Sequence, residues 1–177
     1  IYFYAVLSDG TTAGNRTAFF LIGTFMALWV ILYGLIQANA PRIVRARRRP
    51  TDELIKTARG WAWSLAAVPS ILTGIAIIAG APQLWLTISL VTGLLIFGVV
   101  FAVNSSLHSY LILSFTKAER VTMDVGFYYM ANAAGRLAGT LLSGITYQIG
   151  GLPLMLGVAA FMVALSAMML GLLKPGR

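Results

Sequence analysis

The sequence predicts an all-α, polytopic helical membrane protein, and three observations carry this prediction. Hydrophobic residues make up 59% and charged residues 10% of the 177 residues, whereas a soluble domain carries about 25% charged residues. Residues 17–41 and 60–116 hold no charged side chain, and residues 125–173 hold only Arg136. Because about 20 apolar residues cross a bilayer, the first stretch fits one span and each of the other two fits a pair.

These stretches predict five full spans and one partial span. We expect them at residues 1–7 (partial), 18–39, 61–80, 85–107, 125–147 and 152–173. Glycine-rich and polar segments predict turns at residues 8–16, at 80–83 and at Gly150 and Gly151. Thr51 is the expected N-cap of the next helix, and the helix from Trp85 is expected to continue to Phe115. Seven apolar residues cannot cross a bilayer, so we interpret the sequence as a fragment that starts inside a helix.

The net charge is +8, and the distribution of the basic residues indicates how the chain is oriented in the membrane. Eleven of the 13 Lys and Arg residues fall in connectors that five alternating spans place on one side, and Arg16 falls on the other. By the positive-inside rule the first side, with the C-terminus, is cytoplasmic. The expected basic loop, residues 40–60, holds Arg42, Arg45, Arg47, Arg48 and Arg49. Contact with anionic lipid is an alternative role for these arginines, and nucleic-acid binding is not expected.

The span at 125–147 carries two neighbouring faces of different character. Small residues recur every four positions and predict a helix-packing face: Ala131, Gly135, Gly139 and Ser143. Polar residues form the second face: Tyr128 or Tyr129, Asn132, Arg136, Thr140 and Ser143. A helix of this kind is expected to line a cavity.

Arg136 is the strongest candidate for substrate binding. It lies 11 residues beyond Val125, about 16 Å along a helix and near the bilayer midplane. An arginine at that depth is costly, and its planar donors suit phosphate, arsenate or carboxylate. The alternative is structural: Arg136 binds carbonyl groups or a residue outside this sequence. We expect Asn132, Tyr128 and Tyr129 to line the same cavity.

A second polar cluster ends the span at 85–107. Asn104 and His108 are four residues apart and share a helix face, with Ser105, Ser106 and Ser109 around them. His108, the chain's one histidine, is a candidate for anion binding or proton relay. The alternative is an interfacial hydrogen-bonding role.

Several classes of chemistry are not expected. The chain has no cysteine, and Asp124 stands at the mouth of a span, with no Asp or Glu inside any expected span. We find no arrangement of a nucleophile and a base, no phosphate-binding loop and no metal-ligand cluster. We therefore expect no enzyme activity, no cofactor and no metal.

The basic connector that includes residues 33–48 (YGLIQANAPRIVRARR) resembles the degenerate loop motif in the C-terminal half of major facilitator superfamily transporters, although the usual Gly…Asp-Arg core is not present. Two stretches, VNSSLHSYLILSFTKAERV and VGFYYMANAAGRLAGTLLSG, resemble the ArsJ-type organoarsenical efflux permeases of that superfamily. The resemblance extends over most of residues 17–173.

The resemblance implies a secondary active exporter of 1-arseno-3-phosphoglycerate that confers arsenate resistance by alternating access in the bacterial inner membrane. Its implied partners are the lipid bilayer, a six-helix N-terminal half of the same chain, an anionic substrate and, functionally, glyceraldehyde-3-phosphate dehydrogenase. Two alternatives remain: an exporter of another small molecule, a drug or a sugar phosphate, or a non-transporting membrane scaffold.

Overall fold

The computed structural model describes residues 1–44, 50–116 and 118–172, which form helices and the turns between them. The elements are α1 (Tyr2–Leu7), α2 (Thr12–Ile43), α3 (Thr51–Ala79), α4 (Leu84–Phe115), the short 3-10 helix η2 (Ala118–Arg120) and α5 (Val121–Leu170). The all-α prediction is confirmed. The four longest helices are each long and apolar enough to cross a membrane, which fits a multi-pass membrane protein.

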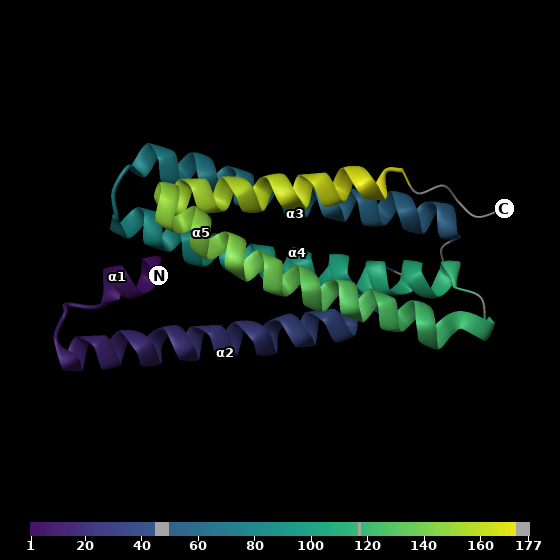
Figure 1. Cartoon of the computed structure of the whole chain (residues 1–177), viewed down its shortest axis with the longest axis horizontal. Coiled ribbons are helices and arrows are strands. Elements are labelled where there is room, and N and C mark those ends of the chain that lie inside the picture. Colours follow the sequence, from purple (N-terminus) through teal and green to yellow (C-terminus); the bar gives the residue numbers. More distant parts are fainter. Residues whose placement is uncertain (45–49, 117, 173–177) are drawn as a thin grey trace.

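The helix α5 consists of two halves that fold back on each other (Figure 1). The break falls at Gly150 (φ −137°, ψ 19°) and Gly151 (φ 64°, ψ −158°), so the turn predicted at these two glycines is confirmed. The backbone of Gly151 lies in a region that residues with a Cβ rarely adopt. A straight helix of 50 residues would be about 75 Å long, whereas the two halves are about 44 Å and about 29 Å long, so each is about long enough for one span.

Most helix ends lie outside the apolar stretches from which they were predicted. The helix α2 extends from Thr12 to Ile43 and includes Pro41, and α4 reaches Phe115 as expected. Apolar composition marks the part of a helix that suits lipid, while backbone hydrogen bonding continues into polar flanks. The expected basic loop at 40–60 is therefore mostly helical where it is described, and Arg45, Arg47, Arg48 and Arg49 lie outside the described residues.

The start of α3 corrects a second expectation. Pro50 is the N-cap residue, with φ −62° and ψ 156°, and Thr51 is already the first helical residue. Thr51 is thus wrong as the N-cap, and no side chain caps this helix. Pro50 needs no hydrogen-bond acceptor for its nitrogen, which suits it to the edge of a helix. Asp52 and Glu53 occupy the first turn, where negatively charged side chains interact favourably with the helix dipole and stabilise the helix.

The connection between α1 and α2 is a tight polar turn, shorter than predicted because α2 begins at Thr12. The Thr11 hydroxyl accepts a hydrogen bond from the Gly14 amide at 3.0 Å and caps the helix. The Asp9 carboxylate accepts hydrogen bonds from the Thr11 hydroxyl at 2.7 Å and the Thr11 amide at 2.9 Å. These two bonds hold the pKa of Asp9 below its ordinary value of 3.8.

Hydrogen bonds join the helix α4 to α1 and α2. Three hydrogen bonds reach it from other helices: Tyr2 Oη with Thr87 Oγ1 at 3.2 Å, Trp29 Nε1 to the Leu94 carbonyl at 2.8 Å, and Gln37 Nε2 to Ser105 Oγ at 3.2 Å. Its Leu107 and Val103 are the largest fully buried side chains among those described. They belong to a core shared by α2, α3, α4 and the end of α5.

The first half of α5 is the least covered part of the described fold. Thr146, near its end, is the one buried residue in this half and is 7% exposed, while Tyr147 beside it packs against a buried cluster. Leu137, Leu141 and Ile145 remain 54–66% exposed. Figure 1 shows this half crossing the molecule beside α4, while the second half lies along α3. Most of the candidate site residues lie on this open helix.

Candidate functional site

The polar face of α5 is open to its surroundings. Arg136 is exposed, Asn132 and Tyr128 are half-buried, and Tyr129 is 64% exposed. The rings of the two tyrosines contact each other, with centroids 5.6 Å apart. Among the described residues, the Arg136 guanidinium has no hydrogen-bond or ion-pair partner. The backbone carbonyl of Arg136 accepts a hydrogen bond from the Thr140 hydroxyl at 2.8 Å.

The small residues of the predicted packing face lie on the same half-helix. Ala131, Gly135, Gly139 and Ser143 are all exposed. Gly135, Gly139 and Ser143 line a groove of about 360 Å³ between the two halves of α5. No described atom lies within 4 Å of a Cβ built on Gly135 or Gly139. Close contact with another helix at this face therefore stays a prediction.

The polar cluster on α4 is less exposed than that on α5, because Asn104 and Ser106 are buried and Ser105, His108 and Ser109 are half-buried. Asn104 is 5% and Ser106 7% exposed. Asn104 Oδ1 and His108 Nε2 are buried atoms without a hydrogen-bond partner in the described part of the chain. A buried polar atom without a partner costs about 1–3 kcal/mol. Such atoms call for an explanation, and an absent ligand, water or donor group is one.

One cavity joins residues from both polar clusters. It has a volume of about 430 Å³ and is lined by His108 of α4, by its C-cap residue Thr116, and by Asp124 and Tyr128 from the start of α5. Asn104 lies one helical turn before His108. Arg136 is eight residues beyond Tyr128, about 12 Å along the helix, and does not line this cavity. The structure thus brings His108 and Tyr128 together and leaves Arg136 apart from them.

The side chains of these two clusters can bind a ligand through hydrogen bonds and charge. In the described ranges no group of three or more His, Asp or Glu side chains could hold a metal ion. His108 can donate or accept a proton, Asp124 carries a negative charge, and the Tyr128 hydroxyl can donate or accept a hydrogen bond. Arg136, farther along α5, supplies a separate positive charge with five donors.

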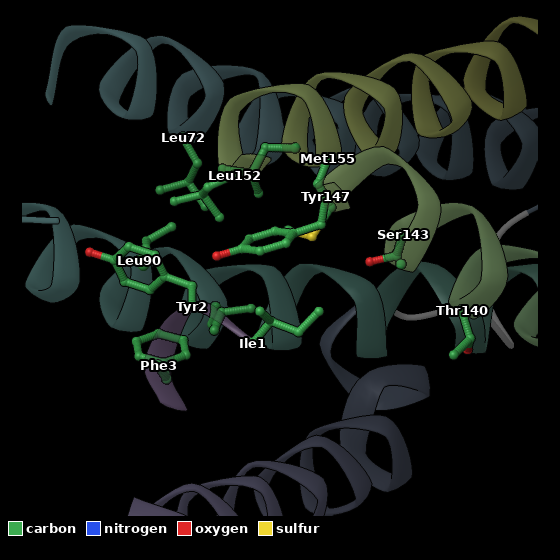
Figure 2. Close-up of a pocket in the computed structure, with 13 residues that line it drawn as sticks. Ile1, Tyr2, Phe3, Leu72, Leu90, Thr140, Ser143, Tyr147, Leu152 and Met155 are labelled. Atoms are coloured by element: carbon green, nitrogen blue, oxygen red, sulfur yellow. The ribbon is translucent and has the colours of Figure 1, made fainter. Parts of the chain in front are cut away.

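Sequence reasoning missed one prominent side chain, Tyr147. It lines a second cavity of about 420 Å³ together with Thr140 and Ser143 of the polar face (Figure 2). Arg136, Thr140, Ser143 and Tyr147 follow one another at intervals of four, three and four residues, which keeps them on one helix face. Extending the polar stripe by one more turn would have found Tyr147.

The chain matches no protein-family model, no curated protein and no solved structure.

Replacing Asn104 with leucine is expected to raise the free energy of unfolding by about 1–3 kcal/mol, because the variant removes a buried acceptor that has no partner. Thermal unfolding of the purified protein in detergent measures this change. The matched control is Asn39→Leu at an exposed position of α2, where the amide nitrogen donates to the Leu35 carbonyl at 2.9 Å. A loss of stability in Asn104→Leu would mean that Asn104 is bonded in the native protein and contributes to the fold.

Proposed function

We propose that this chain forms the C-terminal six-helix half of a secondary active efflux transporter of the major facilitator superfamily, which moves an anionic small molecule by alternating access. The first substrate to consider is 1-arseno-3-phosphoglycerate, which would make the protein an arsenate-resistance determinant functionally linked to glyceraldehyde-3-phosphate dehydrogenase. The C-terminus would lie in the cytoplasm and the helices in the bacterial inner membrane.

The observation that carries this proposal is the environment of Arg136. It stands about 22 Å from the start and about 20 Å from the end of its half of α5, on an exposed face and without a partner among the described residues. A guanidinium at such a depth has to face protein, water or a charged ligand, because contact with lipid tails is costly. A second set of helices that encloses a water-filled cavity with α5 would supply this environment.

Two further features support the proposal. The buried cluster of Asn104 and His108 places unpartnered polar atoms inside an apolar helix, as expected for a transport pathway. The two stretches that resemble the organoarsenical permeases contain these residues and Arg136. The distribution of the basic residues supports the proposed orientation.

Transport by Arg136 variants of the full-length protein tests the proposal. Arg136→Ala is expected to lower arsenate resistance and vesicle export of the organoarsenical by about tenfold or more, because a charge-assisted pair to the substrate contributes about 1.5–3 kcal/mol. Arg136→Lys should retain partial transport, since lysine keeps the charge and loses the planar fork.

The control is Arg120→Ala, which removes an exposed arginine from η2, immediately before α5, and should leave transport unchanged. Expression of each variant is measured in the same membranes. Wild-type transport by both Arg136 variants at normal expression would contradict the proposed role. A chain that transports nothing in any form would favour a non-transporting scaffold.

The cavity beside Tyr147 favours a second candidate, an exporter of another organic anion such as a drug or a sugar phosphate. Its lining is mostly aliphatic and aromatic, which suits a substrate with an apolar portion. A substrate panel separates the two candidates, because an exporter of the second kind would not change arsenate tolerance.

A further inference from the structure

The cavity between α1, α3, α4 and α5 has the size and lining of a small-molecule site. Its volume is about 420 Å³, within the range of about 300–1,000 Å³ typical of ligand pockets. Leu72, Leu90, Leu94 and Leu152 supply aliphatic surface, and the rings of Phe3 and Tyr147 supply aromatic surface. Figure 2 shows the Tyr147 ring reaching from α5 into the middle of this lining.

Two hydroxyl groups in this cavity are free to bind a ligand. Thr140 Oγ1 is committed to the Arg136 carbonyl at 2.8 Å, and Tyr2 Oη contacts Thr87 Oγ1 at 3.2 Å. By contrast, the hydroxyls of Ser143 and Tyr147 make no hydrogen bond in the described parts of the chain. The cavity therefore combines an apolar wall with a few available polar groups, which is the usual composition of a specific binding pocket.

Arg136 lies on the same face of α5 as the residues that line the cavity. Thr140, Ser143 and Tyr147 line it, and Arg136 continues the same face of α5 one turn before Thr140. Arg136 and Tyr147 are 11 residues apart, about 16 Å along the helix. A molecule with its body beside Tyr147 and an anionic group toward Arg136 would lie along this face. The charge of Arg136 is thus complementary to one end of such a ligand.

We propose that this cavity binds the aromatic or alkyl body of an amphipathic organic anion whose charged group pairs with Arg136. The inference rests on the anion-binding role of Arg136 in the proposed function and narrows its substrate class. An anion without an apolar body, such as the organoarsenical, would use only the arginine end of the face and would leave the cavity lined by Leu90 and Leu94 unfilled.

Binding of two probes to the full-length protein in lipid nanodiscs tests this inference by calorimetry. The probes are 1-naphthyl phosphate and inorganic phosphate, which share the anionic group and differ in the apolar body. The wild-type protein is expected to bind the naphthyl ester about tenfold or more tightly than phosphate, because burying apolar groups in a pocket gives discrimination of that size.

Ser143→Leu places a bulky side chain in the cavity and should remove this preference while leaving phosphate binding unchanged. Thr140→Leu, on the same lining, is a second variant in case the first does not fold. Arg136→Gln should weaken the binding of both probes. The matched control is Ala134→Leu, at an exposed position of the same helix outside this cavity, which should bind both probes like the wild type.

The results distinguish a failure of the cavity inference from a failure of the proposed function. Equal wild-type affinities for the two probes would overturn the cavity inference alone, as would a naphthyl preference that survives both cavity variants. A lipid tail that fills the cavity would give the first of these results. Unchanged binding of both probes in Arg136→Gln would overturn the pairing with arginine and, with it, the anion-binding role in the proposed function. A wild-type protein that binds neither probe would contradict both.

Discussion

Replacing Gly98 with alanine is expected to lower the free energy of unfolding by about 2–4 kcal/mol, because the added methyl group would collide with a ring that joins two helices. A Cβ built on Gly98 lies 2.8 Å from Trp29 Nε1 and 3.0 Å from Trp29 Cε2. That indole nitrogen donates to the Leu94 carbonyl at 2.8 Å. The ring would have to move away from α4, and the hydrogen bond would break with it.

The ring of Trp29 also begins a row of aromatic contacts between α2 and α4. It stacks on Tyr33 with centroids 5.9 Å apart, and Tyr33 contacts Phe101 at 5.5 Å. A displaced indole therefore disturbs more than one contact. Trp29→Phe keeps an aromatic ring but removes the N–H donor and part of the indole surface. It should therefore cost at least the roughly 0.5–1.5 kcal/mol that is typical of a hydrogen bond.

Thermal unfolding in detergent measures the effect, with Gly34→Ala as the matched control. Gly34 is a helical glycine of α2 with nothing within 4 Å of its built Cβ, so its substitution should cause no loss of stability. If Gly98→Ala unfolds like the wild type, α2 does not pack on α4 through Trp29.

The order of the helices could be predicted from the sequence, because each helix and each turn depends on the residues of its own segment. Stretches without charge located the long apolar helices, and the adjacent Gly150 and Gly151 made the reversal within α5 predictable, where Gly151 adopts a φ of 64°. The helix ends were less accurate, because Thr12 and Pro41 lie inside α2 although both fall outside the span expected at residues 18–39. Composition records preference for lipid, while a helix ends where its backbone finds another set of hydrogen bonds.

The arrangement of the candidate site was predictable only in part. The spacing of Asn104 and His108 identified their shared face, since that property belongs to one helix. Their burial depends on helices far away in the chain, as does the bond from Gln37 to Ser105, which joins residues 68 positions apart. Likewise, nothing in the order of Ala131, Gly135 and Gly139 indicates that this face borders a groove within α5. Such features come from the packing of whole helices.

The second large effect is expected at Leu107, where substitution by alanine should lower the free energy of unfolding by about 2–5 kcal/mol. Its side chain is 0% exposed and packs in the core that holds Ala58, Ala62 and Ala167. In a membrane, lipid tails solvate leucine as well as protein does, so the loss comes mainly from missing van der Waals contacts around the cavity.

The matched control for this variant is Leu113→Ala on the same helix, where the leucine is 55% exposed and the cost should stay within about 0.5 kcal/mol. Equal losses for the two variants, measured by unfolding in detergent, would contradict the described burial of α4. Leu107 immediately precedes His108 and lies three residues after Asn104, so its packing fixes the rotation of the helix that carries both. On the transport function proposed above, Leu107→Ala should therefore weaken transport as well as stability.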